Sequence, residues 1–106
     1  MDINIESPHL EITRELEQNI RLQFSRLKKV YDRITGCEVV LKKANEGQKK
    51  NCEVEARLLI PKGSFFARDK AETFEMAVKN IMESLLRQLK HDKESRRETW
   101  KLPGLL

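Results

Sequence analysis

The chain has 106 residues, with 21 Lys and Arg against 17 Asp and Glu and a formal net charge of +4. That length allows one domain with a single core, and the charge gives a modest bias towards polyanions. The first residues do not show the basic segment followed by an apolar one that is typical of a secretory signal, so we predict no such signal. No apolar run is long enough to span a membrane, so we predict no membrane anchor. The two cysteines are then expected to be reduced thiols in the cytosol.

The first elements predicted along the chain are a strand and a helix. Ile3 and Ile5 alternate with polar residues, which indicates a short strand with one buried face that ends at Ser7-Pro8. Thr13 is a candidate N-cap for a helix whose apolar residues follow at helical spacing. Those residues are Leu16, Ile20, Phe24, Leu27, Tyr31 and Ile34. Gly36 is expected to stop this helix.

Three further strands and a long helix are predicted in the remainder of the chain. Residues 37–42 and 52–60 alternate as two strands of a hairpin that turns near Gly47, and residues 64–68 form a third strand after a turn at Pro61-Lys62-Gly63. From about Ala71 the apolar period becomes helical as far as Leu89. Residues 91–98 are almost wholly charged, so the end of this helix should project beyond the sheet or fray.

The order β-α-β-β-β-α predicts an α+β two-layer fold with a four-stranded mixed sheet. A right-handed crossover would make the first two strands parallel and leave the others antiparallel. Both helices would cover one face of the sheet, and the other face would stay in water. That second face would carry Glu38, Lys42, Glu53, Glu55 and Arg57. Residues 1–98 are assigned to this domain and residues 99–106 to a tail of unknown role.

Residues that commonly carry chemistry are few and scattered. Cys37 and Cys52 lie on different strands and do not form a close pair of the C-x₂-C kind that zinc sites use. His9 and His91 have no nearby partner in the sequence that suggests a nucleophile or a base. Phosphate-binding glycine motifs are also missing from the sequence. We therefore predict no catalytic residue, no metal, no cofactor and no small-molecule substrate.

The positions of the basic residues point to RNA. At about 100° per residue, Arg26, Lys29 and Arg33 share one flank of the first helix, and Arg21 and Lys28 share the other. The second helix contributes Arg87, Lys90 and Lys93. Two helices side by side on a sheet would pool such flanks into a groove-like patch that binds phosphates. The alternative is a solvated face with intrahelical ion pairs, such as Glu83 with Arg87.

Three short runs carry a resemblance to a known family: Glu11-Ile12-Thr13, Tyr31-Asp32-Arg33-Ile34 and Leu85-Leu86-Arg87-Gln88-Leu89-Lys90. With the element order, they make residues 1–93 similar to the ribosome hibernation-promoting factor and ribosome-associated inhibitor family, also called sigma-54 modulation proteins. The resemblance implies binding to the small ribosomal subunit in the channel for messenger and transfer RNA, under stress or in stationary phase. Translation would then be blocked by occupancy.

The resemblance also implies particular contacts to ribosomal RNA. The family's basic positions match Arg26, Lys29 and Arg87 here. Three further positions that are often basic in the family are Gln23, Ser84 and His91 in this chain. The neighbouring basic residues that would compensate are Arg21, Lys28, Lys90 and Lys93.

Other functions remain open from the sequence. Double-stranded RNA-binding domains use a related α-β-β-β-α order, and a regulator that binds a sigma factor would match the older family label. Long members of the family carry a further dimerisation domain, for which 106 residues leave no room. The resemblance is therefore to the short form, which we expect to be a monomer away from the ribosome.

Overall fold

A computed structural model describes residues 1–44, 47 and 49–101, although the side chains of residues 95–101 lie outside this description. The elements in chain order are β1 (Asp2–Glu6), α1 (Arg14–Val30), β2 (Gly36–Lys43), β3 (Cys52–Ile60), β4 (Gly63–Ala71) and α2 (Phe74–Lys101). This is the predicted β-α-β-β-β-α order.

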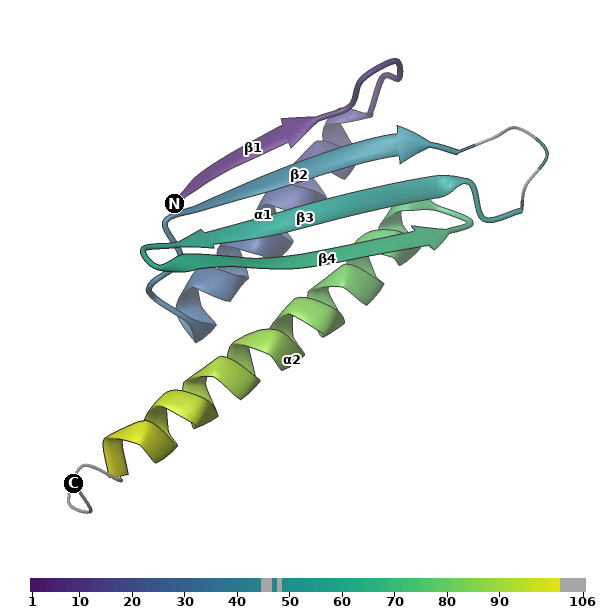
Figure 1. Cartoon of the computed structure of the whole chain (residues 1–106). Helices are drawn as coiled ribbons and strands as arrows, with labels where there is room; N and C mark the ends of the chain where they lie inside the picture. The colour runs from purple at the N-terminus through teal and green to yellow at the C-terminus, as the bar shows by residue number, and fades with distance from the viewer. Residues whose placement is uncertain (45–46, 48, 102–106) are drawn as a thin grey trace.

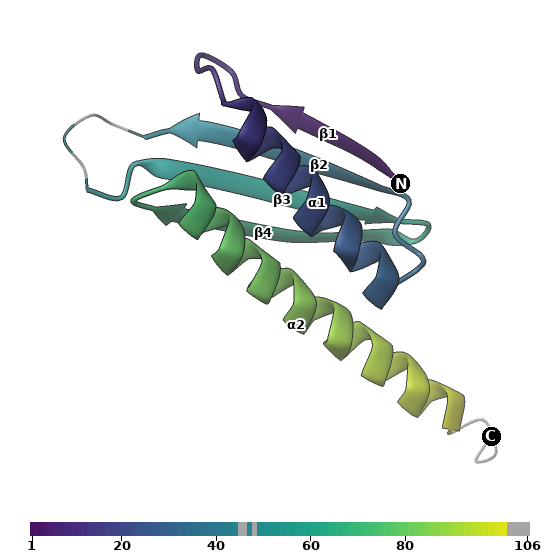
Figure 2. The ribbon, with the colours of Figure 1, turned by 180° about the vertical axis from the view of Figure 1, so that it is seen from behind.

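The four strands form one sheet in the order β1-β2-β3-β4. β1 runs parallel to β2, and the pairs β2–β3 and β3–β4 are antiparallel. Both helices cover the same face, with α1 over the β1 side and α2 along β4 (Figures 1 and 2). The predicted mixed sheet with two helices on one face is therefore confirmed.

The core lies between the sheet and the helices. Its largest fully buried side chains come from both layers and include Phe24, Ile20 and Leu27 of α1, Leu41 and Leu58 of the sheet, and Ile81, Leu85 and Leu89 of α2. On the opposite face of the sheet, Glu53 and Glu55 are half-buried by ion pairs with Arg68, and Lys42 also pairs with Glu55. The charges on this face largely neutralise one another, so it is an unfavourable surface for a polyanion.

The end of α1 differs from the prediction. The Thr13 hydroxyl accepts a hydrogen bond from the Leu16 amide, as expected of an N-cap, but the helix ends at Val30 and not at Gly36. Tyr31 adopts an extended backbone (φ −142°) that buries its ring in the core. Gly36 instead begins β2, where an added Cβ would lie 3.4 Å from the Asp2 carbonyl oxygen and from Leu59. The glycine therefore permits close strand packing.

Two other boundaries and one register also differ from the predictions. β4 continues past residue 68 to Ala71, because its last residues pair with the first residues of β3. α2 consequently starts at Phe74 rather than near Ala71, and the Thr73 hydroxyl accepts a hydrogen bond from the Met76 amide in the manner of an N-cap. A hairpin that turns near Gly47 would place Cys37 opposite Arg57 and Cys52 opposite Lys42. In the structure, Cys37 faces Leu58 and Cys52 faces Lys43, a difference of one residue in each pair.

The last turns of α2 extend beyond the sheet, as predicted for residues 91–98 (Figures 1 and 2). The backbone of this helix runs to Lys101, past the predicted domain boundary at residue 98. Most of the tail at 99–106 lies outside the described residues, so its role stays a prediction. Among the helices of the described part, none combines the length and the apolar character needed to cross a bilayer.

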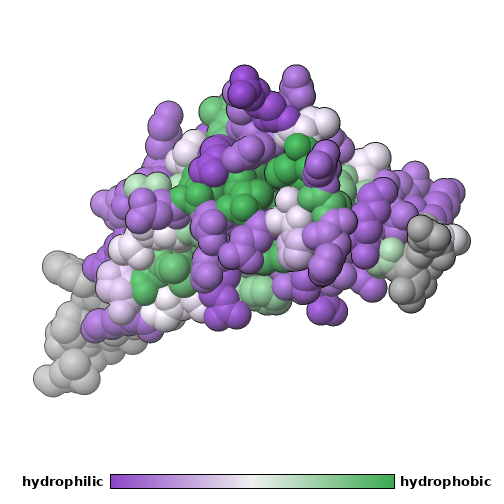
Figure 3. Space-filling model, turned by 90° about the horizontal axis from the view of Figure 1, so that it is seen from above, coloured by the Kyte–Doolittle hydropathy of each residue, from purple (hydrophilic) through white to green (hydrophobic). Residues whose placement is uncertain are grey.

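β1 is an edge strand of the sheet, and a side chain of α1 covers part of its free edge. Ile3 and Ile5 pack against the core from this edge. The view from above, on the β1 side of the molecule, shows apolar side chains surrounded by hydrophilic ones (Figure 3). The Arg21 guanidinium donates a 2.9 Å hydrogen bond to the Ile3 carbonyl oxygen. Arg21 therefore occupies a backbone acceptor that a further strand would need.

Candidate nucleic-acid interface

The C-terminal halves of α1 and α2 enclose a basic groove, here called the interhelical groove. It consists of two adjoining hollows of ≈ 300 and ≈ 390 Å³ that share Val30 and Lys93. Its basic residues are Lys29, Arg33, Lys90 and Lys93, and its acidic residues are Asp32 and Glu94. The four cations against two anions leave an excess of two positive charges. Such a groove suits the phosphates of a nucleic-acid strand.

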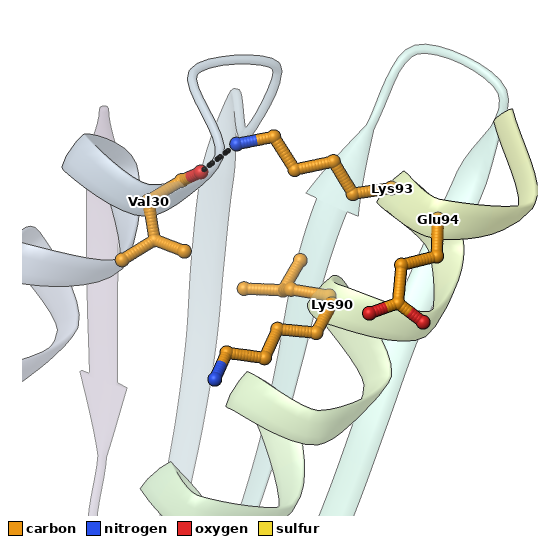
Figure 4. A pocket seen from close by; sticks show the side chains of 5 residues that line it. Val30, Lys90, Lys93 and Glu94 are labelled. Carbon is orange, nitrogen blue, oxygen red and sulfur yellow. Dashed lines mark hydrogen bonds between the residues drawn. The ribbon is translucent and has the colours of Figure 1, made fainter. Parts of the chain in front are cut away.

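Hydrogen bonds connect α2 with the C-terminal end of α1 beside this groove. The Lys93 ammonium donates a 3.3 Å hydrogen bond to the Val30 carbonyl oxygen at the end of α1, and the Lys90 side chain extends from α2 towards α1 (Figure 4). The Tyr31 hydroxyl donates a 2.6 Å hydrogen bond to the Asp92 carboxylate. Both contacts join the last residues of α1 to the part of α2 that carries the basic side chains.

The α1 side of the groove carries the basic flank that was predicted for the first helix, but only two of its three basic residues lie on the helix itself. Lys29 lines the groove, and Arg26, one turn earlier, is exposed on the same flank. Arg33 also lines the groove, but it lies in the connection after the helix and not on α1 as predicted. Within the described residues, the side chains of Arg26 and Lys29 form no hydrogen bond or ion pair, so their charges are available to a ligand.

Arg21 and Lys28 lie on the other flank of α1 and are engaged in the fold. Besides its bond to Ile3, Arg21 forms an ion pair with Glu17 at 3.2 Å. The Lys28 ammonium donates two 2.7 Å hydrogen bonds, to the carbonyl oxygens of Asp32 and Ile34. The structure thus places both residues away from the interhelical groove. Sequence reasoning placed Lys28 and Lys29 on opposite flanks of the helix but could not tell which flank faces the groove, because that depends on the position of α2 and on the path of the chain after Val30.

Arg87 lines a different hollow from Lys90 and Lys93. This hollow, here called the Phe65 hollow, lies between α2 and β4, encloses ≈ 430 Å³, and is lined by Phe65, Arg87, Gln88, His91 and Asp92. Sequence reasoning assigned Phe65 only to a strand. The signal that was available is the alternation of β4, which puts Phe65 on the helix side of the sheet together with Ala67.

Two of the three positions where the family is often basic are engaged in local hydrogen bonds. The Gln23 amide donates to the Asn19 side chain at 3.0 Å, and the Ser84 hydroxyl accepts from Gln88 at 3.3 Å. Both side chains are half-buried, whereas His91 is exposed at the Phe65 hollow. Of the neighbours expected to compensate, Lys90 and Lys93 lie in the interhelical groove.

The cysteines are core residues. Both are free and buried, and burial, with a smaller effect of the nearby Glu38 carboxylate, raises the pKa of the Cys37 thiol to about 12. A thiol of this kind is a poor nucleophile and a poor metal ligand at neutral pH. Within the described part of the chain, no three His, Cys, Asp or Glu side chains are grouped as a metal site would require.

The structure is an α+β two-layer domain whose two helices cover one face of a mixed four-stranded sheet and border a basic groove. The chain belongs to the family described as Sigma 54 modulation protein / S30EA ribosomal protein, whose model matches residues 3–97. The description names a modulation protein and a ribosomal protein.

Individual relatives support the assignment. The chain is 34% identical over 94 residues to a ribosome hibernation promoting factor of Pseudomonas putida, covering 89% of this chain and 88% of that protein. It is 33% identical over 100 residues to one of Acinetobacter guillouiae, covering 88% of each. The family resemblance read from the sequence is therefore confirmed.

Solved structures share the fold. A ribosomal subunit interface protein of Coxiella burnetii superposes with a TM-score of 0.78 at 20% identity, over 89% of this chain and 99% of that one. The N-terminal domain of Protein Y from Thermus thermophilus gives a TM-score of 0.72 at 23% identity, over 86% and 98%. At these identities the likeness concerns the fold alone.

Proposed function

We propose that this protein binds ribosomal RNA of the small ribosomal subunit through the interhelical groove and inhibits translation by occupying the channel for messenger and transfer RNA. The observation that carries the proposal is the convergence of Lys29, Arg33, Lys90 and Lys93 on one groove in a chain of the S30EA family. The names of the Pseudomonas and Acinetobacter relatives support a role in ribosome hibernation, which would place the protein in the cytoplasm under stress or in stationary phase.

The mechanism requires no bond to be made or broken. Lysine and arginine side chains replace the counterions of the RNA backbone, and the release of those ions favours binding. A body 57 Å long and 25 × 18 Å across then excludes other ligands from the RNA surface that it covers. Neither a cofactor nor a small-molecule substrate takes part, and the protein is a monomer away from the ribosome.

The direct test is co-sedimentation with purified small subunits over a range of salt concentrations. The wild-type protein should bind at low salt and dissociate as salt rises. The triple variant Lys29→Gln, Lys90→Gln and Lys93→Gln should bind more weakly. Its salt slope, meaning the steepness with which the logarithm of the binding constant falls against the logarithm of the salt concentration, should be lower by about one for each phosphate that the protein no longer neutralises. Unchanged affinity and slope in this variant would refute the groove as the binding site.

A charge-matched control separates the groove from net charge. Lys42→Gln, Lys50→Gln and Lys70→Gln remove three exposed charges elsewhere on the molecule, so this variant should retain nearly all of the affinity. Competition with transfer RNA on small subunits, and inhibition of an in vitro translation reaction, test occupancy of the channel. Equal affinity for bare RNA duplexes would instead indicate a general double-stranded RNA-binding module.

A further inference from the structure

Arg87 lies beside an aromatic hollow that a purely electrostatic interface would not need. We propose that the Phe65 hollow holds one unstacked nucleobase of the bound RNA. This inference rests on the proposed RNA-binding function and adds a second contact to it, of a different chemical kind from the phosphate contacts of the interhelical groove.

The hollow has the composition of a base-stacking site. Phe65 offers a half-exposed aromatic ring, and Arg87 and His91 are exposed beside it. Single-stranded bases are commonly recognised by stacking on aromatic rings or on arginine planes, because every base has a π face. The volume of ≈ 430 Å³ falls within the range of small-ligand sites, roughly 300–1,000 Å³. An open hollow also suits a base that remains attached to its strand.

Three of the residues that line the hollow are held by contacts within the protein. The Phe65 ring meets the Tyr31 ring edge to face, with centroids 6.1 Å apart and planes at 80°. Asp92 is held by the Tyr31 hydroxyl at 2.6 Å, and the Gln88 amide donates to the Phe66 carbonyl oxygen at 2.8 Å. A preformed site of this kind loses little conformational entropy on binding.

Charge favours a neutral base over a phosphate inside the hollow. The Asp92 carboxylate lines it together with Arg87, so an anion placed there would be attracted by one side chain and repelled by the other. A phosphate of the same nucleotide can instead lie outside, against the exposed Arg87 guanidinium. The site therefore divides a nucleotide into a base that enters and a phosphate that stays at the rim.

The interhelical groove and the Phe65 hollow are close enough for one RNA strand. Arg87 and Lys90 are three residues apart on α2, and residues at this spacing are neighbours on a helix surface. Lys90 lines the groove and Arg87 lines the hollow. A strand that crosses the outer surface of α2 thus passes from the phosphate contacts of the groove to the hollow.

Phe65 and Phe66 provide a matched pair for the test. Phe66 is 46% exposed on the polar face of the sheet. The Cζ atom of Arg57 lies over its ring, 5.6 Å from the ring centroid. We expect Phe65→Leu to lower the affinity for small ribosomal subunits about tenfold without changing the salt slope, because neither side chain carries a charge. Phe66→Leu should bind like the wild type. Equal affinities for the two variants would overturn the proposal.

A second variant avoids any effect of Phe65→Leu on folding. Arg87→Gln removes an exposed side chain, so it should leave thermal unfolding unchanged, weaken binding and reduce the salt slope by about one. An unaltered salt slope would show that Arg87 does not contact an RNA phosphate, and would contradict the proposed phosphate contact at the rim of the Phe65 hollow.

The wild-type complex gives the decisive readout. A cryo-electron microscopy map of this protein on small subunits should show a single ribosomal base against the Phe65 ring. A hollow occupied by a ribosomal protein side chain, by a phosphate or by solvent alone would overturn the inference while leaving the proposed function intact. Failure of the wild-type protein to bind small subunits would instead refute the proposed function itself.

Discussion

Lys28 and Lys29 are adjacent on α1 and have the same side chain but opposite surroundings. The Lys28 ammonium donates hydrogen bonds to two backbone carbonyl oxygens in the connection to β2, where no neighbouring helix or strand of the described residues supplies partners for them. Lys29 is exposed at the interhelical groove. One residue therefore stabilises the fold, and the other contributes charge to the surface.

Replacing each lysine by glutamine separates these roles. Lys28→Gln should lower the free energy of unfolding by about 1–2 kcal/mol, because it removes both charged hydrogen bonds. Lys29→Gln should leave stability within about 0.5 kcal/mol of the wild type and reduce the salt slope of ribosome binding. Urea denaturation and co-sedimentation measure the two effects. The reverse pattern would contradict the assignment.

The Cys37 thiol makes the free energy of unfolding decrease as the pH rises through the alkaline range. Its thiol has a pKa of about 12 in the folded protein against an ordinary value of 9.0, so between these values the unfolded chain loses a proton that the folded chain keeps. The stabilisation is fully present below pH 9 and is lost as the pH rises towards 12. Denaturation at pH 8 and 10.5 should show a steeper loss for the wild type than for Cys37→Ala. Parallel losses would mean that the Cys37 thiol ionises equally in both states.

At the scale of elements, α2 depends on α1 for the position of its second half. Beyond the sheet, the described contacts of α2 include the Tyr31–Asp92 and Lys93–Val30 hydrogen bonds, and both use the last residues of α1. A helix segment with few buried apolar contacts opens more readily than the core. Lys90 follows the buried Leu89, whereas Lys93 lies beyond this core residue and is positioned by the two polar contacts.

Tyr31→Phe tests this dependence. The substitution keeps the ring that meets Phe65 and removes only the hydroxyl, so we expect a loss of about 1 kcal/mol in the free energy of unfolding. Hydrogen exchange should accelerate for the amides of residues 88–94 more than for those of residues 77–85, which belong to the part of α2 over the sheet. Uniform acceleration along the helix would show that the hydrogen bond does not anchor this segment locally.

The same elements show what the sequence could predict. Alternation and helical spacing identified the strands and helices of the described residues, and the buried face of each except β4, because those patterns depend on local geometry. The ends of α1 and β4 were wrong, because tertiary contacts set them: Tyr31 leaves the helix to enter the core, and β4 continues as long as β3 offers partners. The groove was predictable in outline only, since the orientation of α1 against α2 decides which flank meets it.

At the scale of the whole molecule, the sheet has two edge strands, and a helix side chain donates a hydrogen bond to the backbone of each. Arg21 of α1 donates to the Ile3 carbonyl oxygen of β1, and Gln88 of α2 donates to the Phe66 carbonyl oxygen of β4. Unpaired edge strands are templates for pairing between molecules. Both helices therefore act on the solution behaviour of the protein as well as on its proposed RNA contacts.

The double variant Arg21→Ala and Gln88→Ala should expose both edges and promote self-association. Light scattering after size-exclusion chromatography should show its apparent mass rising with concentration, while the wild type stays monomeric. Arg26→Ala with Gln18→Ala is the matched control, because it removes the same residue types from exposed sites on α1. Association of the control to the same extent would attribute the effect to the reduced charge. Association of the double variant alone would show that the strand edges are what the two side chains protect.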